Sequence, residues 1–139
     1  MSALDVAKQF FAACEAGKGA AGCQPFMADG ATFSAQSEPI AEITTLAGYC
    51  DWMRVLAEGI LTDARYDLHT TGWDEANQTA TFVATFHGTH LGDQGPVPAT
   101  KKATASHYVY MVQMNADGKV AHMIKVWNAP WAMRELGWA

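Results

Sequence analysis

The N-terminal part of the chain has apolar residues at the spacing of an α-helix. They recur every three or four positions at Leu4, Ala7, Phe11 and Cys14. Ser2 and Asp5 stand three residues apart just before this run, which is the spacing of a capping box. Gly17 breaks the pattern, so we expect a first helix that ends before it. A short second helix is expected over residues 20–27, followed by a short strand over 31–35.

A third helix has the strongest pattern of the chain. One face at a spacing of about 3.6 residues is formed by Leu46, Tyr49, Met53, Leu56 and Ile60. Trp52 lies beside Tyr49 on the same face, because three residues of 100° each fall about 60° short of a full turn. Thr44 or Thr45 can cap this helix.

After Asp63 the hydrophobic period changes from about 3.6 residues to two. This alternation predicts four long strands, over residues 65–73, 80–90, 103–114 and 119–127. Residues 115–118 read Asn-Ala-Asp-Gly, a hairpin turn. Asn128 and Pro130 are typical of the start of a helix, and Gly137 of its end.

Helices that precede a run of antiparallel strands predict an α+β fold. The helices are too few to cover a flat sheet, so we expect a cone-shaped, curved, mixed sheet with the helices packed on its concave face around a pocket. With 139 residues the chain fits one domain over 1–139.

Composition narrows the function classes. The net charge is -5 and no basic run occurs, which argues against nucleic acid and anionic membranes as partners. Cys14, Cys23 and Cys50 lack metal-site spacing and read as buried thiols. Together with an N-terminus that has no secretory signal, they favour the cytoplasm. The histidines form no metal-binding motif and no phosphate loop follows a strand, so neither a metal nor another cofactor is expected.

The residues that line the expected pocket can be assigned by counting outward from the hairpin. If Asn115 pairs with Lys119, alternation puts one set of side chains on the concave side, namely Tyr108, Tyr110, His122, Ile124 and Asn128. A shift of one residue would exchange the set for its neighbours, His107, Met111, Lys125 and Trp127. The other expected lining residues come from the third helix and the second long strand, namely Tyr49, Trp52, Met53, Phe82 and Phe86, with His90 at the pocket mouth.

Each of these residues also has a structural interpretation. His90 can fix the shape of the Gly/Pro-rich loop that follows it, and His122 can be a hydrogen-bonded core histidine. Asn128 can be no more than a helix cap. The aromatic residues can be ordinary core, although an aromatic ring beside a cavity still shapes what binds there.

Three segments occur in order along the chain. The first is Tyr-Asp-Leu-His at 66–69. The second is Gly-Thr-His-Leu-Gly at 88–92 with the Pro-rich run up to Lys102. The third is Asp-Gly-Lys-Val at 117–120 with Trp127, Asn128 and the Leu-Gly at 136–137. Together they resemble the SnoaL-like polyketide cyclases of the nuclear transport factor two-like superfamily, in which the first segment is similar to Pro-Asp-Leu-His and a Gly stands in place of Lys101. Asn128 stands where the family's cyclases commonly have Asp, and an amide does not transfer protons as a carboxylate does.

The resemblance and the expected pocket imply a cofactor-independent cyclase or isomerase. It would act on a small apolar carbonyl compound, with His122 as the base and Tyr110 or Asn128 as the hydrogen-bond donor to an enolate oxygen. Two alternatives keep the fold but not the chemistry: a non-catalytic domain that binds an apolar ligand, and a dimeric scaffold. A homodimer is expected because the convex face of the sheet would carry apolar residues, which this register assigns as Val83, Val109, Met111, Met123 and Trp127.

Overall fold

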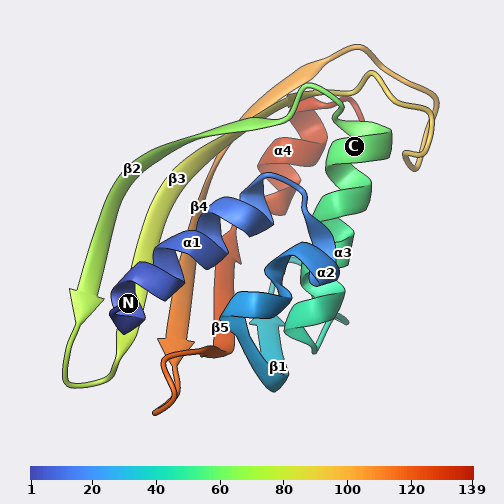
Figure 1. Cartoon of the computed structure of the whole chain (residues 1–139). Helices are drawn as coiled ribbons and strands as arrows, with labels where there is room; N and C mark the ends of the chain where they lie inside the picture. Colours follow the sequence, from blue (N-terminus) through green and yellow to red (C-terminus); the bar gives the residue numbers. More distant parts are fainter.

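The computed structural model describes all 139 residues and confirms the predicted α+β order of elements (Figure 1). Its helices and strands are α1 (Ala3–Glu15), α2 (Gly19–Cys23), β1 (Met27–Ala35), α3 (Leu46–Val55), β2 (Arg65–Asp74), β3 (Thr79–Thr89), β4 (Ala103–Met114), β5 (Val120–Trp127) and α4 (Ala129–Glu135). A π-helical turn over Leu56–Ile60 continues α3, and 3-10 turns lie at Gln24–Phe26 and Glu38–Ile40. None of the helices has both the length and the apolar character needed to cross a membrane.

The strands form one mixed sheet in the order β1-β5-β4-β3-β2. β1 runs parallel to β5, and the other neighbours are antiparallel. Figure 1 shows that the long strands bend and that α1, α2 and α3 lie across the concave side, with α4 beyond the end of β5. The predicted curved sheet with helices on its concave face is therefore confirmed.

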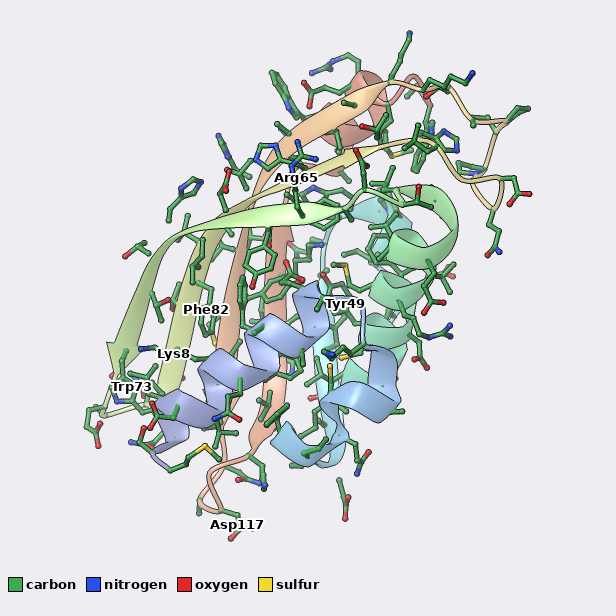
Figure 2. The ribbon with its side chains drawn as sticks, turned by 45° about the horizontal axis from the view of Figure 1, so that its top comes forward. Lys8, Tyr49, Arg65, Trp73, Phe82 and Asp117 are labelled. Atoms are coloured by element: carbon green, nitrogen blue, oxygen red, sulfur yellow. The ribbon has the colours of Figure 1, made fainter.

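The core lies between these helices and the inner face of the sheet. Phe11 of α1 stacks on Phe82 of β3 with 4.6 Å between ring centroids, and Phe33 of β1 stacks on Tyr49 of α3 at 4.4 Å. Figure 2 shows Tyr49 and Phe82 between the helices and the sheet, and Asp117 at the tip of the β4–β5 hairpin. This packing fixes α1 and α3 relative to the strands that carry the site.

The loop between β3 and β4 is docked on the end of the π-helical turn. The backbone N–H of Gly92 donates to the carbonyl oxygen of Ile60 at 2.9 Å. A Cβ on Gly92 would lie 2.0 Å from the carbonyl oxygen of Gly59, so this close backbone approach requires glycine. Lys101, at the far end of the loop, has a φ of 61°, a left-handed conformation that glycine adopts more readily than lysine.

The register of β5 differs from the predicted register at one residue. The N–H of Asn115 does bond to the carbonyl oxygen of Lys119, as predicted, and Met114 pairs with Val120. Ala121 is then an extra residue, because Gln113 pairs with His122. This β-bulge reverses which side chains of β5 face inward from there on. Met123, Lys125 and Trp127 lie on the inner face, opposite Val112, Tyr110 and Tyr108.

Candidate functional site

A cavity of about 280 Å³ lies between α3 with its π-helical turn, α4, and the ends of β4 and β5. Of its 19 lining residues, 13 are hydrophobic, so it suits a small and largely apolar ligand. The polar groups in the wall are few, and they include the carboxyl group of Glu15, the hydroxyl of Tyr108 and the amine of Lys125. These are the chemically active groups that a ligand in the cavity would meet.

Glu15 is the last residue of α1, and its side chain points into the core. Only 5% of the residue is exposed. Its carboxylate accepts one hydrogen bond from the hydroxyl of Tyr108 and another from the hydroxyl of Tyr110, the latter at 2.8 Å. A buried carboxylate needs such partners, because an unpaired charge in an apolar interior is very costly.

Lys125 brings a second ionisable group to the same place from β5, and it is 6% exposed. Its amine lies 4.5 Å from the ring centroid of Trp127, 5.1 Å from that of Tyr49 and 5.5 Å from those of Trp52 and Tyr108. Contacts of this kind stabilise the ammonium ion through the negative faces of the rings. The amine also donates a hydrogen bond to the hydroxyl of Tyr49 at 2.9 Å.

Two tyrosine hydroxyls connect the amine to the carboxylate. Tyr49 and Tyr110 are hydrogen-bonded to each other. Because the hydroxyl proton of Tyr110 is donated to Glu15, Tyr49 must be the donor to Tyr110. The oxygen of Tyr49 is then free to accept from Lys125. The hydrogen bonds therefore point in one direction, from Lys125 through Tyr49 and Tyr110 to Glu15.

Burial changes the acid–base behaviour of both ends of this path. Loss of water raises the pKa of Glu15, while the charge of Lys125 and the tyrosine hydroxyls oppose that rise. Burial lowers the pKa of Lys125 from 10.5 to about 8, and the charge of Glu15 opposes that fall. Burial likewise holds the pKa of Tyr108 above its ordinary value, so this phenol stays protonated as a donor. Each group is thus moved toward its neutral form, as acid–base catalysts often are.

Such a set can perform chemistry next to a carbonyl group. A carboxylate with a raised pKa can take a proton from a carbon beside the carbonyl. A phenol and an ammonium ion can stabilise the negative charge that develops on the oxygen. The site resembles no nucleophile–histidine pair, since none of the histidines lines the cavity.

Solved structures of other proteins show the same architecture. IdmH from Streptomyces antibioticus, a candidate polyketide cyclase, has a TM-score of 0.77 at 12% identity, with 99% of each chain covered. A candidate SnoaL-like polyketide cyclase from Jannaschia sp. CCS1 has a TM-score of 0.77 at 15% identity, covering 96% of this chain and 90% of the other. An NTF2-like protein from Burkholderia thailandensis has a TM-score of 0.75 at 17% identity over 97% of each chain.

The protein therefore shares the fold of these SnoaL-like and NTF2-like structures. Its sequence matches no family model and no curated protein. At identities this low the likeness establishes the fold, and the chemistry has to be argued from the site.

Within this SnoaL-like fold, several of the predicted pocket residues line the cavity, namely Trp52, Met53, Phe86 and Tyr108. Tyr49 and Tyr110 are fully buried behind the wall and contribute their hydroxyls to the hydrogen-bond path. Phe82 is fully buried core between α1 and β3, and does not line the cavity. Tyr108 and Tyr110 of β4 therefore both face inward, as predicted, but only Tyr108 lines the cavity.

The residues of β5 and its C-terminal end that were predicted to line the pocket lie elsewhere, so this part of the prediction is wrong. His122 and Ile124 lie on the outer face of the sheet because of the bulge at Ala121. The ring of His122 is hydrogen-bonded there to the hydroxyl of Thr32 at 2.7 Å. Asn128 caps α4 by accepting a hydrogen bond from the backbone N–H of Trp131 at 3.2 Å, and it does not line the cavity.

His90 is fully buried, but it shapes the loop and not the cavity wall. Its Nδ1 accepts hydrogen bonds from the indole of Trp138 at 2.9 Å and from the backbone N–H of Thr100 at 3.3 Å. Its Nε2 has no hydrogen-bond partner and faces Gly95, where a Cβ would lie only 2.7 Å away. The structural interpretation of His90 fits these contacts, since it joins the loop to the C-terminal segment.

Glu15 was absent from the predicted site, and Lys125 was placed in it only by the alternative register. Both leave a signal in the sequence. Glu15 follows Phe11 by four residues, so it extends the apolar face of the first helix with a charged side chain. Lys125 lies in an otherwise apolar alternation between Met123 and Trp127. A single charge on an apolar face is expensive to bury, and it marks a candidate for function.

Proposed function

We propose that this protein is a cofactor-independent enzyme of the cyclase or isomerase type that moves a proton on a small, largely apolar carbonyl compound. The observation that carries the proposal is the buried Glu15 carboxylate in the wall of an apolar cavity, beside Tyr108 and Lys125. Its raised pKa brings the carboxyl group closer to neutral pH, where a general base is most effective.

The role of each residue follows from its contacts. Glu15 takes the proton from the carbon beside the carbonyl group. Tyr108, which donates to Glu15 and also lines the cavity, can donate to the carbonyl oxygen of a ligand instead. Lys125 places a positive charge close to the same oxygen. The aromatic rings and the residues of α4 exclude water, which strengthens these electrostatic interactions. The base is thus Glu15 in this proposal, and His122 on the outer face has no part in it.

The comparisons add support of a weaker kind. Two of the similar structures are described as candidate polyketide cyclases. Intramolecular aldol-type ring closure begins with removal of a proton beside a carbonyl group, which is the step proposed for Glu15. A hydrophobic polyketide-like carbonyl compound also suits the apolar lining.

The test uses β-tetralone, an apolar bicyclic ketone, as a probe. Exchange of its α-protons with D₂O is followed by NMR, with and without protein. We expect the protein to accelerate exchange, and Glu15→Gln to lower the protein-catalysed rate by roughly 10²–10⁴-fold. The matched control is Glu58→Gln, which changes an exposed glutamate of the π-helical turn that does not line the cavity; it and His122→Ala should keep the wild-type rate.

The alternative function, a non-catalytic binding domain, predicts a different result. β-Tetralone would then shift the NMR signals of cavity residues such as Trp52 and Trp127, while its α-protons exchange no faster than in buffer. Acceleration that survives Glu15→Gln would contradict the assignment of Glu15 as the base.

A further inference from the structure

Lys125 occupies an unusual place for a lysine. It is buried, it lines the cavity, and it makes no direct ion pair with any carboxylate, since the ion pairs of the structure involve Arg54, Arg65 and His87. Lysine is rarely buried without such a partner. Its only hydrogen bond to the protein is the one to Tyr49, and the rest of its surroundings are aromatic rings. Loss of water around the amine outweighs the attraction of the rings for the ammonium ion and moves the amine toward its neutral form, whose lone pair is available.

The geometry points to Lys125 as a nucleophile that forms an imine with the carbonyl carbon of a small aldehyde or ketone held in the cavity. This inference rests on the proposed function, because it takes the same carbonyl compound as its ligand. It adds a covalent step, in which an iminium ion replaces the carbonyl group as the acceptor of electrons when the neighbouring proton is removed.

The step is balanced without any further reactant. The lone pair of the neutral amine forms the C–N bond, and the π electrons of the C=O bond move to oxygen, which takes up a proton. Loss of a proton from nitrogen gives a carbinolamine. Protonation of its hydroxyl group and departure of water then leave the iminium ion. Water attacks the same carbon in the reverse sequence and releases the ligand from Lys125.

The structure supplies a route for the protons that this step requires. The ammonium form of Lys125 donates to Tyr49, Tyr49 to Tyr110, and Tyr110 to Glu15. A proton leaving Lys125 along this path ends on the Glu15 carboxylate. Glu15 lines the cavity too, so it can return that proton to the departing oxygen. The amine is thereby freed for attack by the same transfer that generates the acid.

The altered basicity of the amine supports this role. A pKa of about 8 instead of 10.5 makes the neutral amine about 300-fold more abundant near neutral pH than in an exposed lysine. Lysines that form imines are commonly activated in this way, by removal of water around the amine.

The experiment traps the imine with sodium cyanoborohydride. The protein is incubated with β-tetralone and the reductant at about neutral pH, where exposed lysines are largely protonated, and is then analysed by intact mass spectrometry and peptide mapping. We expect one adduct per chain, with a mass increase equal to the probe less one oxygen atom, located on Lys125. Lys125→Arg and Lys125→Met should each lower the trapping rate on the order of 100-fold. The matched control is Lys8→Arg, on the exposed side of α1 (Figure 2), which should trap at the wild-type rate.

The outcomes separate this inference from the proposed function. Absence of an adduct, or adducts spread over surface lysines, overturns imine formation; if exchange of α-protons still depends on Glu15, the proposed function stands. A Lys125 adduct together with exchange that does not depend on Glu15 supports the inference and contradicts the role of Glu15. Mapping of the wild-type adduct does not rely on any variant, so a misfolded Lys125 variant leaves the test decisive.

Discussion

Lys125 and Glu15 are the two buried charges of the site, and they influence each other without direct contact. Two tyrosine hydroxyls lie between them, and the hydrogen bonds run from the amine to the carboxylate. The charge of each residue nevertheless opposes the shift that burial imposes on the pKa of the other. The path therefore holds a pair of charges apart in a low-dielectric interior, where their interaction is strong.

Removing one hydroxyl from this path should cost stability. Tyr49→Phe leaves the Lys125 amine without its acceptor, so we expect the free energy of unfolding to fall by roughly 1–3 kcal/mol. Urea denaturation at neutral pH measures this change. Tyr66→Phe is the matched control, because Tyr66 packs edge-on against Phe11 at 5.4 Å and lies outside the path. Equal effects of the two substitutions would show that the Tyr49 hydroxyl contributes nothing to Lys125.

The stability of the protein should also depend on pH through Lys125. Its pKa is lowered from 10.5 to about 8 on folding. Between these values the unfolded chain binds a proton that the folded chain has lost, so the contribution of this group to stability rises with pH across that window. It is lost as the pH falls through about 8, where the buried amine becomes charged.

Lys125→Met removes this dependence. Relative to the wild type, the variant should be most stable near neutral pH, and its advantage should shrink by roughly 2 kcal/mol between about pH 7 and pH 10. Denaturation curves at both pH values measure the change. Lys8→Met controls for the loss of one positive charge on the surface. A difference between variant and wild type that stays constant with pH would contradict the lowered pKa.

The fold could be predicted from the sequence because its signals are local and repeated. The change of period near Asp63, the glycines that end helices and the cap residues fixed the elements to within a few residues. The predicted pocket depended on the register of β5, and a shift of one residue in that register reverses which side chains face inward. One extra residue at Ala121 exchanged His122 and Ile124 for Lys125 and Trp127, and neither the composition nor the hairpin turn contains information about that bulge.

The pairing of Glu15 with Lys125 was beyond prediction for another reason. The two residues are 110 positions apart in the chain, and their proximity exists only once α1 has packed on the sheet. Each appeared as an isolated charge on an apolar face. Tyr49 and Tyr110, which connect them, were predicted as pocket residues. Which hydroxyl donates and which accepts is set only by the Glu15 carboxylate at the end of the path.

Asn128 should prove to be a structural residue. Its side chain accepts from the N–H of Trp131, and a carboxylate can accept the same bond. Asn128→Asp should therefore change the free energy of unfolding by less than ~1 kcal/mol, whereas Asn128→Ala should cost about 1 kcal/mol through loss of the cap. Neither substitution should alter the exchange of β-tetralone α-protons. Faster exchange in Asn128→Asp would instead show that a carboxylate at this position reaches the ligand.

The homodimer remains a prediction, and the bulge changes the residues on which it rests. Met123 and Trp127, expected on the convex face, lie on the inner face. Their places are taken by Ile124 and Val126, which are 36% and 62% exposed and share the outer face with Val83, Val109 and Met111. An apolar strip on an uncovered sheet is typical of an interface between subunits.

Light scattering tests this interface directly. At micromolar concentration we expect the wild type to scatter as twice the chain mass of 15.0 kDa. Val126→Lys places a charge within the apolar strip, and two copies would meet across a twofold axis, so the dimer should dissociate to monomers. Leu91→Lys is the matched control, because Leu91 is 51% exposed in the loop after β3 and lies off the sheet face. A wild type that scatters as a monomer would refute the dimer, and equal dissociation by both substitutions would refute the assignment of the convex face as its interface.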